Sequence, residues 1–432
     1  MDIRMTPLEV ARALQSAMER GLMGSEDTSL IIYDLDRLRS RLQEARQAFP
    51  EGTLHAVAVK ANPLPAVLRR LADEHPCIGA EAASLPELEL ALGAGFGPER
   101  ILFDSPAKTH AELRLALERG IVLNADNFQE LERMAGLLGG ASIGAAKLHG
   151  GIGLRVNPQV GAGAIATTSV AGQYSKFGVP VSECRDEILA AFERYSWLTG
   201  LHSHVGSQGC SLEQLCAGVR TLLDLAEEIN SRLPERIRLL DIGGGLPATY
   251  RDSEPKSSLM DYAQALRQRC PELWSGRYRI ATEFGRAIHA NAAFAAARVE
   301  YVKTQAGVVT AVTHLGADMF LRKCYNPGDW HHDVLAVDGS GQIKAGEAVV
   351  QTIAGPLCFQ GDLPARDVSL PLLEQGDAVC FRDVGAYTLS MWSRYNSRQM
   401  PAVLGMTRSE EGPRFTILRA RESVEQVLRF WE

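Results

Sequence analysis

The stretch LHAVAVKANP, residues 54–63, is typical of a buried strand that ends at a lysine. Its short apolar run suits a strand that is covered on both faces. The run ends at Lys60, and Asn62-Pro63 separates it from a helical pattern that begins near Val67. Because an unpaired buried ammonium is costly, Lys60 either extends to solvent or is a reactive amine that forms a Schiff base with an aldehyde cofactor.

The composition of the whole chain excludes several classes of protein. Its 432 residues have room for two domains, and 46% hydrophobic and 22% charged residues are ordinary for a globular protein. The formal net charge of -7, with no basic cluster, argues against nucleic-acid or anionic-membrane partners. We expect no secretory signal, because the first residues are not apolar, and no membrane span. Eight scattered cysteines without a CxxC pair indicate reduced thiols in the cytoplasm and no zinc site.

From residue 53 onward, strand and helix patterns alternate along the chain. Amphipathic helical stretches separate most of the strand candidates, and an open doubly wound sheet is the alternative arrangement. The number of strands favours an α/β fold with a (β/α)8 TIM-type barrel. The eight strand candidates lie near residues 54–59, 77–80, 101–104, 121–125, 152–156, 198–203, 237–242 and 278–283.

Polar or glycine-rich residues follow each predicted strand. In a barrel all the carboxyl ends of the strands meet on one face, where the active site forms. The sequence therefore predicts a site on this rim, with a lysine, a histidine, a glycine cluster and a glutamate as its chemically active members. In strand order the residues are Lys60, Glu81, Asp104, Asp126, Arg155 with Asn157, His204, the glycines 243–245 and Glu283.

The pattern changes after residue 286 to short strand candidates separated by glycine, proline and charged turns. These candidates lie near residues 299–302, 308–312, 334–337, 348–353, 378–381 and 415–418. We expect a polar, partly helical arm over residues 1–28, the barrel over 29–290 and an all-β domain over 291–432. A strand near residues 29–33 can also belong to the β domain.

Three rim motifs suggest particular chemistry. The glycines 243–245 can cradle a phosphate with their N–H groups or form a tight turn. In HSHVGSQ, residues 202–208, a histidine can lie against an aromatic cofactor and Ser207 can bind its phosphate; two histidines at this spacing can also bind a metal, but the motif has no carboxylate. In TEFGR, residues 282–286, Glu283 can pair with a pyridine nitrogen and Arg286 with a carboxylate or phosphate, or both can form surface ion pairs.

Together these motifs resemble the fold-III decarboxylases that depend on pyridoxal 5'-phosphate (PLP), the group of diaminopimelate, ornithine and arginine decarboxylases with an alanine racemase-like barrel. The resemblance runs from about residue 30 to residue 404 and is closest to the diaminopimelate decarboxylases. It is carried by SKFG at 175–178, HVGSQ at 204–208, GAY at 385–387, SM at 390–391 and YNSR at 395–398.

The resemblance implies roles for individual residues and no metal. Lys60 carries the aldimine with PLP, His204 stacks on the pyridine ring and Glu283 pairs with its nitrogen. Cys358 of the partner subunit, in a head-to-tail homodimer, protonates the quinonoid carbanion left by loss of carbon dioxide. The phosphate is held by Ser207, Gly243, Gly244, Gly245 and Tyr387, with Gly285 or Arg286 close by. The substrate is bound by Arg286, Arg322, Tyr325, Phe359 and Asp362.

The sequence departs from the resemblance where the far end of the substrate is bound. Phe359 stands where diaminopimelate decarboxylases have a glutamate and ornithine decarboxylases an aspartate, and Phe284 replaces a proline. The segment 162–168 lacks the histidines of the diaminopimelate enzymes, and the stretch 322–330 is shifted in spacing. The expected reaction is therefore decarboxylation of diaminopimelate or of a related, modified amino acid.

Two other functions are open. The first is a PLP-dependent racemase or epimerase on the same barrel, although such enzymes usually place an arginine, not a glutamate, against the pyridine nitrogen. The second is a non-catalytic PLP-binding regulator. Lys60, His204, Glu283 and Cys358 argue against the regulator, because it has no need of a general acid.

Overall fold

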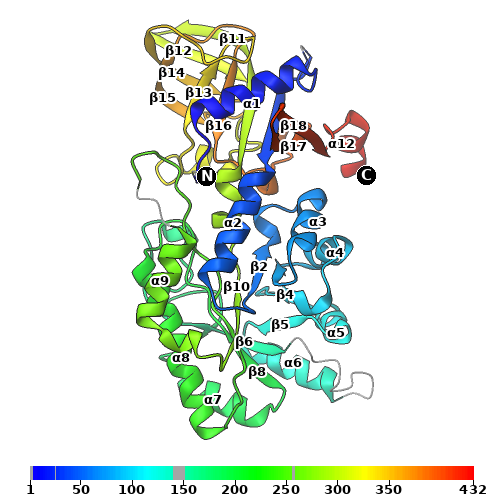
Figure 1. Cartoon of the computed structure of the whole chain (residues 1–432), viewed down its shortest axis with the longest axis vertical. Coiled ribbons are helices and arrows are strands. Elements are labelled where there is room, and N and C mark those ends of the chain that lie inside the picture. Colours follow the sequence, from blue (N-terminus) through cyan, green and yellow to red (C-terminus); the bar gives the residue numbers. More distant parts are fainter. Residues whose placement is uncertain (1–2, 25, 140–150, 255–257) are drawn as a thin grey trace. The chain divides into compact units, whose positions relative to one another are not determined.

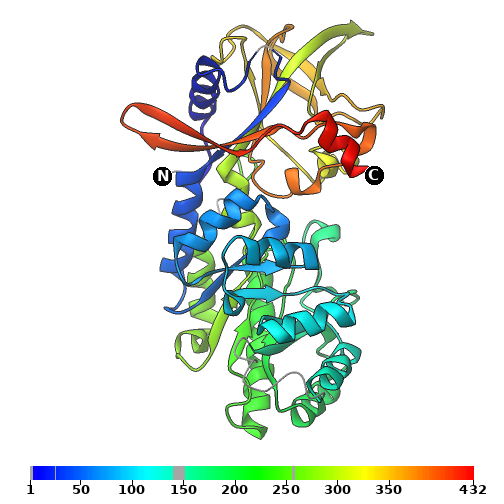
Figure 2. The ribbon, with the colours of Figure 1, turned by 90° about the vertical axis from the view of Figure 1, so that its right-hand side faces the viewer.

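A computed structural model describes residues 3–24, 26–139, 151–254 and 258–432. Met1, Asp2 and Ser25 of the expected arm, and residues 140–150 and 255–257 of the expected barrel, lie outside the described residues. The chain divides into two compact units, which we describe separately (Figures 1 and 2). The barrel unit comprises Arg41–Ala248 and Ser257–Ile288, and the β unit comprises Met1–Ser40, Thr249–Lys256 and His289–Glu432.

Eight parallel strands of the described residues close into a barrel. Their order is β5-β4-β3-β2-β10-β9-β8-β6, and pairing of β5 with β6 completes the ring. This confirms the predicted (β/α)8 barrel and excludes the open sheet. The barrel strands are β2 (Leu54–Ala58), β3 (Ile78–Ala82), β4 (Ile101–Phe103), β5 (Val122–Ala125), β6 (Ile152–Asn157), β8 (Leu198–His202), β9 (Leu239–Asp241) and β10 (Arg279–Thr282), and the short β7 (Val179–Pro180) pairs with β6.

The helices of the barrel unit begin sharply after the strand ends. The side chains of Ser84, Thr109, Asn127, Ser211 and Ser258 each accept the N–H of the residue three positions later. Such caps fix the loops that carry the rim residues. No described helix is long and apolar enough to cross a membrane. The helices are α3 (Pro65–Glu74), α4 (Leu85–Gly93), α5 (His110–Arg119), α6 (Phe128–Leu138), α7 (Arg185–Arg194), α8 (Leu212–Arg232) and α9 (Leu259–Arg269), while α2 (Leu35–Ala48) and α10 (Arg286–His289) each extend over both units.

The β unit contains one mixed sheet. Strand β1 pairs antiparallel with β11 and parallel with β17, so the segment near Leu30 lies within this sheet. Two strands, β15 and β17, were not predicted from the sequence. The strands are β1 (Ser29–Asp34), β11 (Ala293–Gln305), β12 (Val308–Thr313), β13 (Val334–Val337), β14 (Ala348–Ala354), β15 (Ala365–Pro371), β16 (Ala378–Arg382), β17 (Ala402–Ser409) and β18 (Gly412–Arg419).

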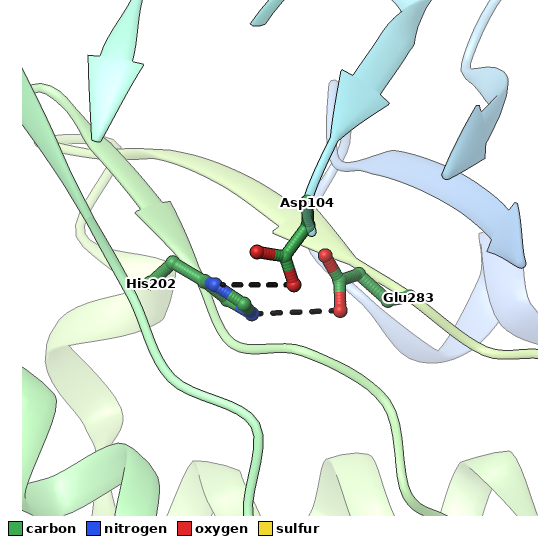
Figure 3. A group of neighbouring side chains, drawn as sticks. All are labelled: Asp104, His202 and Glu283. Carbon is green, nitrogen blue, oxygen red and sulfur yellow. Dashed lines mark ion pairs between the residues drawn. The ribbon is translucent and has the colours of Figure 1, made fainter. Parts of the chain in front are cut away.

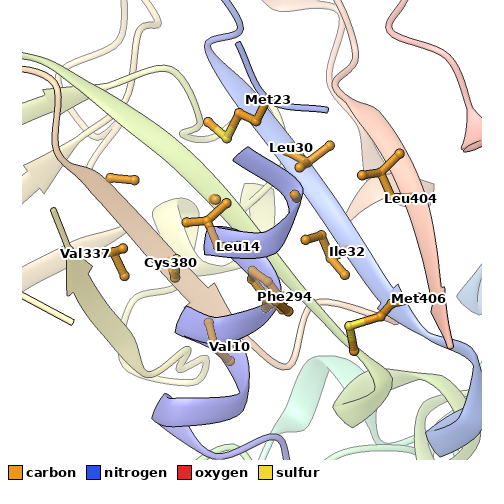
Figure 4. Close-up of a cluster of buried hydrophobic side chains, with 14 of the residues drawn as sticks. Val10, Leu14, Met23, Leu30, Ile32, Phe294, Val337, Cys380, Leu404 and Met406 are labelled. Atoms are coloured by element: carbon orange, nitrogen blue, oxygen red, sulfur yellow. The ribbon is translucent and has the colours of Figure 1, made fainter. Parts of the chain in front are cut away.

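Helix α1 (Pro7–Glu19) lies in the segment expected to be a partly helical arm, and its apolar residues belong to the core of the β unit. Thr6 and Glu9 form a capping box at its start, and Pro7 occupies the first turn. Its apolar face, with Val10 and Leu14, packs into a cluster that includes Phe294 of β11 (Figure 4). The unit also contains the short helices α11 (Leu321–Tyr325) and α12 (Val424–Phe430).

Candidate active site

Along each of several barrel strands, the residues that point into the barrel change from apolar to polar or charged within two positions. A buried cluster deep in the barrel contains side chains of β4, β5, β9 and β10. Because side chains two positions apart on a strand share a face, the next inward residue on each strand lies directly above this cluster. The steps are Leu102 to Asp104, Val122 to Asn124, Leu239 to Asp241 and Ala281 to Glu283. A layer of buried polar groups therefore lies at the carboxyl ends of the strands, where the sequence predicts a site.

Lys60 lies in a single helical turn, Val59–Ala61, directly after β2. Its Nζ forms an ion pair with Glu81 Oε2 of β3. The Lys60 side chain is 41% exposed, whereas that of Glu81 is fully buried. Burial raises the pKa of Glu81, and the charge of Lys60 opposes this rise. The amine is thus accessible to a small molecule and has an acidic partner beneath it.

His202, the last residue of β8, lies between two carboxylates (Figure 3). Its Nδ1 is 3.6 Å from Asp104 Oδ2, and its Nε2 is 3.5 Å from Glu283 Oε2. Arg155 Nη1 donates to the same oxygen of Asp104 at 3.1 Å. This arrangement could not be predicted from the histidine motif, which has no carboxylate, because the partners are the residues that follow β4 and β10.

His204 has a different environment from His202. The N–H of Gly244 donates to His204 Nδ1 at 3.0 Å, so the ring proton of a neutral His204 is on Nε2. Burial lowers the pKa of His204 to about 3. A neutral ring fixed at one edge by a backbone donor is suited to stacking on an aromatic group, and the stacking of His204 on PLP stays a prediction.

The glycine loop approaches its neighbours too closely for side chains. A Cβ on Gly244 would lie 2.2 Å from the carbonyl oxygen of Glu283, and Gly243 and Gly245 have φ values of +66° and +97°. Two of the loop's N–H groups are already donors: that of Gly243 to Asp241 Oδ1 and that of Gly244 to His204. Glycine is therefore required here because the loop backbone packs closely against the backbone of neighbouring segments. Its contact with a phosphate stays a prediction.

Two further predicted phosphate ligands lie together. Arg286 Nε donates to Ser207 Oγ at 3.3 Å. Arg286 is buried and begins α10, while Ser207 follows β8 in the HVGSQ motif. The guanidinium and the hydroxyl thus converge from adjacent parts of the rim.

The remaining predicted residues belong to the β unit. The Arg322 guanidinium lies over the rings of Trp330 and Tyr387, 4.9 and 5.1 Å from their centroids. The rings of Tyr325 and Phe359 stack with centroids 4.9 Å apart and an interplanar angle of 15°. The structure thus brings Arg322 together with Tyr387 and Tyr325 together with Phe359 within this unit.

Cys358 is exposed on a loop that is held in place by its neighbours. Its N–H donates to Asn396 Oδ1 at 2.8 Å, and its carbonyl accepts from the Tyr395 hydroxyl at 3.0 Å. Asp362 is buried, and its two carboxylate oxygens accept the N–H groups of Ala317 and Leu357. Asp362 therefore holds this loop, and substrate binding by Asp362 stays a prediction.

Asp104, His202 and Glu283 are the described groups that come nearest to a metal site. Ligand atoms of the three lie within 4.8 Å of one another. The guanidinium of Arg155 already binds Asp104, and the charge of Lys60 acts on Glu283. Because a divalent ion would be repelled by both cations, this cluster is better described as an internal chain of ion pairs.

Two hollows of the barrel unit, of about 550 and 850 Å³, lie away from the rim. They are lined by residues from the starts of strands, such as Leu54, Thr53 and Arg279. The amino ends of barrel strands are the stability face, and active sites form at the other end. These hollows are therefore not the candidate site.

A lysine amine, a neutral imidazole and a buried carboxylate at the mouth of a barrel define a class of enzyme that works on amines through a lysine-bound aldehyde. The family described as "Pyridoxal-dependent decarboxylase, pyridoxal binding domain" matches residues 35–290. The chain belongs to this family of PLP-dependent decarboxylases, as the sequence motifs predict.

Relatives of known name agree with this assignment. The chain is 32% identical to a diaminopimelate decarboxylase of Methanothermobacter thermautotrophicus, over 93% of this chain and 91% of that protein. It is 32% identical to a diaminopimelate decarboxylase of Pseudomonas aeruginosa over 90% of each. A crystal structure of diaminopimelate decarboxylase from Helicobacter pylori complexed with L-lysine superposes with a TM-score of 0.80 at 28% identity, covering 96% of this chain and 99% of that one.

The residues of the barrel rim fit PLP. Glu283 Oε1 is buried and has no hydrogen-bond partner among the described residues, so it can accept from a protonated pyridine nitrogen. Burial alone would raise the pKa of Glu283, but His202, Lys60 and His204 hold it well below its usual range. An ionised carboxylate with one free oxygen is the partner that such a ring requires.

Substitution of Gly244 by alanine should weaken PLP binding about tenfold or more, because the new Cβ would strike the carbonyl of Glu283 and a backbone shift costs roughly 1–3 kcal/mol. The measurement is the Kd for PLP of the reconstituted apoprotein. Gly136→Ala in α6, where a Cβ meets open space, is the matched control and should bind PLP normally. Equal affinity of Gly244→Ala and wild type would refute the close-approach interpretation.

Proposed function

We propose that this chain decarboxylates a diaminopimelate-type amino acid, or a related amino acid whose distal group is modified. The observation that carries the proposal is the ion pair of Lys60 with the buried Glu81 at the same rim as Glu283. The neutral His204 lies next to Glu283, with its Nδ1 3.9 Å from Glu283 Oε2. The 32% identity to named diaminopimelate decarboxylases supports this substrate class. When bound, PLP supplies an aldehyde that captures the substrate amine and an electron sink for the carbanion left after carbon dioxide departs.

Lys60 binds the cofactor and must release it when substrate arrives. Such an exchange needs a neutral amine at Nζ. Glu81 Oε2 lies against this Nζ, and its raised pKa allows it to take up the proton that Lys60 loses. Glu81 thus holds the proton between turnovers.

The other rim residues hold the cofactor. His204, neutral and fixed by the N–H of Gly244, would cover one face of the ring. Glu283 keeps the ring nitrogen protonated, which favours carbanion stabilisation and so favours a decarboxylase over the racemase alternative. Ser207 and Arg286 hold the phosphate. Tyr387 belongs to the β unit, and its contribution stays a prediction.

The proton that returns to the substrate carbon comes from Cys358 of the partner subunit in a homodimer. Its thiol is exposed, and its backbone is held by Tyr395 and Asn396, as suits a donor presented to another chain. The eight cysteines are free, which supports the proposal of a cytoplasmic enzyme.

The distal part of the substrate meets Phe359 and Tyr325. Their stacked rings offer apolar faces and no carboxylate to a distal ammonium. A bare ammonium there would meet ring faces but no carboxylate that accepts its hydrogen bonds in place of water. The preferred substrate therefore has a neutral, apolar or bulky distal group, or a charge that another residue meets.

Lys60 should be the residue that holds PLP. The purified protein should absorb in the visible range, and borohydride should link the cofactor covalently to the peptide that contains Lys60. Lys176→Ala removes an exposed lysine of the same unit and should leave the label in place, whereas Lys60→Ala should abolish it. A label on another peptide would refute the assignment.

Mixing inactive Lys60→Ala chains with Cys358→Ala chains should restore up to about a quarter of the activity, because half of a random dimer population would hold one intact site. Subunit exchange is verified with differently tagged chains. Cys184→Ala, which alters another free cysteine, should be active without mixing. No recovery after verified exchange would contradict the shared site.

Phe359→Glu should raise kcat/KM for meso-diaminopimelate, lysine or ornithine by about one to two decades, because a charge-assisted hydrogen bond to the distal ammonium contributes roughly 1.5–3 kcal/mol. Phe359→Leu, which adds no acceptor, is the control and should not gain. High wild-type efficiency on diaminopimelate without a gain in Phe359→Glu would mean that another residue meets the ammonium.

A further inference from the structure

His202 is buried completely, and its two ring nitrogens face the carboxylates that follow β4 and β10, those of Asp104 and Glu283 (Figure 3). A neutral imidazole has one N–H and can donate to only one of two carboxylates, whereas an imidazolium can donate to both. The charge state of His202 therefore depends on whether Asp104 and Glu283 are both ionised.

The neighbours of Asp104 keep it ionised. Arg155 Nη1 donates to Asp104 Oδ2 at 3.1 Å, and the ring of Phe177, from the SKFG motif, packs against the guanidinium at 4.5 Å. Burial would raise the pKa of Asp104, but Arg155 and His202 lower it below its usual value. Lys108 acts in the same direction. A protonated Asp104 that donates to a neutral His202 is therefore disfavoured.

The other charged groups around His202 are also consistent with a protonated, positively charged ring. Asp241 is its register partner on β9, and burial together with Glu283 raises the pKa of Asp241 well above its usual value. Asp241 is hydrogen-bonded to Asn124 and to the N–H of Gly243. Lys60, with Glu81 beside it, follows the neighbouring strand β2, and its charge also acts on Glu283. The interior thus contains a chain of alternating charge: Arg155, Asp104, His202 and Glu283.

We propose that His202 is a positioning residue: as an imidazolium between Asp104 and Glu283, with Nε2 3.5 Å from Glu283 Oε2, it keeps Glu283 ionised through its charge. Glu283 Oε1 has no hydrogen-bond partner among the described residues, so the ionised carboxylate keeps the capacity to accept a hydrogen bond from the cofactor's ring nitrogen. This inference deepens the proposed function and rests on the proposed role of Glu283. The two histidines of the HSH motif then have different roles: the neutral His204 covers the cofactor ring, and the charged His202 keeps the carboxylate of Glu283 ionised.

The expected pH range follows from the direction of the shift. Burial alone would lower the pKa of His202, but Asp104, Glu283 and Asp241 raise it to about 9. A group whose pKa is raised on folding has its charge throughout the neutral range and loses it only as the pH rises through that value. Protonation of the ring nitrogen should therefore persist through neutral pH and fall on the alkaline side.

The test is nitrogen-15 NMR of the holoenzyme, with the label in the pyridine nitrogen of PLP and, separately, in histidine. Wild type at neutral pH should show a protonated ring nitrogen and one histidine with both nitrogens protonated, whose signal is absent from His202→Gln. In His202→Gln the ring nitrogen should shift to the unprotonated position. His55→Gln is the matched control, because His55 is another buried barrel histidine, which bonds Thr282 and packs against Phe49.

The outcomes distinguish the proposed role of Glu283 from the proposed role of His202. An unprotonated ring nitrogen in wild type would overturn the role of Glu283, whereas a ring nitrogen that stays protonated in His202→Gln would overturn the role of His202 alone. Asp104→Asn provides a second variant if His202→Gln does not fold, and in it the imidazolium signal should titrate at lower pH. A singly protonated wild-type His202, or a stoichiometric metal in the purified protein, would also overturn the proposal.

Discussion

The structure depends on how the barrel accommodates charge in its interior. A buried ionised group is costly unless an opposite charge lies next to it. Arg155, Asp104, His202 and Glu283 meet this constraint by alternating in sign along a path from β6 to the end of β10. Breaking any link would leave an unpaired charge, so Glu283, which is proposed to bind the cofactor, is held in its ionised state by groups that are not proposed to touch the cofactor.

The same constraint explains why the rim can contain chemically different groups so close together. Two histidines two residues apart differ in charge because one lies between two carboxylates and the other accepts a backbone N–H. Two glutamates differ likewise: burial dominates at Glu81 and raises its pKa, whereas cations dominate at Glu283 and lower its pKa. When two groups of the same kind have pKa values shifted in opposite directions by their environments, one can act as an acid or base while the other acts as an electrostatic partner.

Much of this arrangement could be predicted from local patterns. The apolar runs marked all eight barrel strands, and the polar residue after each run marked the rim, because strand ends and loops are encoded in short stretches. Strands β15 and β17 were missed: ARDVSLP and AVLGMTRS contain charged or glycine residues, and they are strands because neighbours in the sheet pair with them. The pairing of His202 with Asp104 and Glu283 was missed for a similar reason, since it joins residues about a hundred positions apart that only barrel closure brings together. The sequence also could not reveal that Gly243 and Gly244 already donate within the protein.

The central claim is that the enzyme forms a carbanion by removing carbon dioxide from an amino acid, and that this carbanion is then protonated. The most direct measurement is incubation of the holoenzyme in deuterium oxide with amino acids labelled with carbon-13 in the α-carboxyl group. The account predicts release of labelled carbon dioxide together with an amine that contains one deuterium at the former α-carbon. Deuterium in the recovered amino acid without carbon dioxide release would instead indicate a racemase or epimerase and contradict the account.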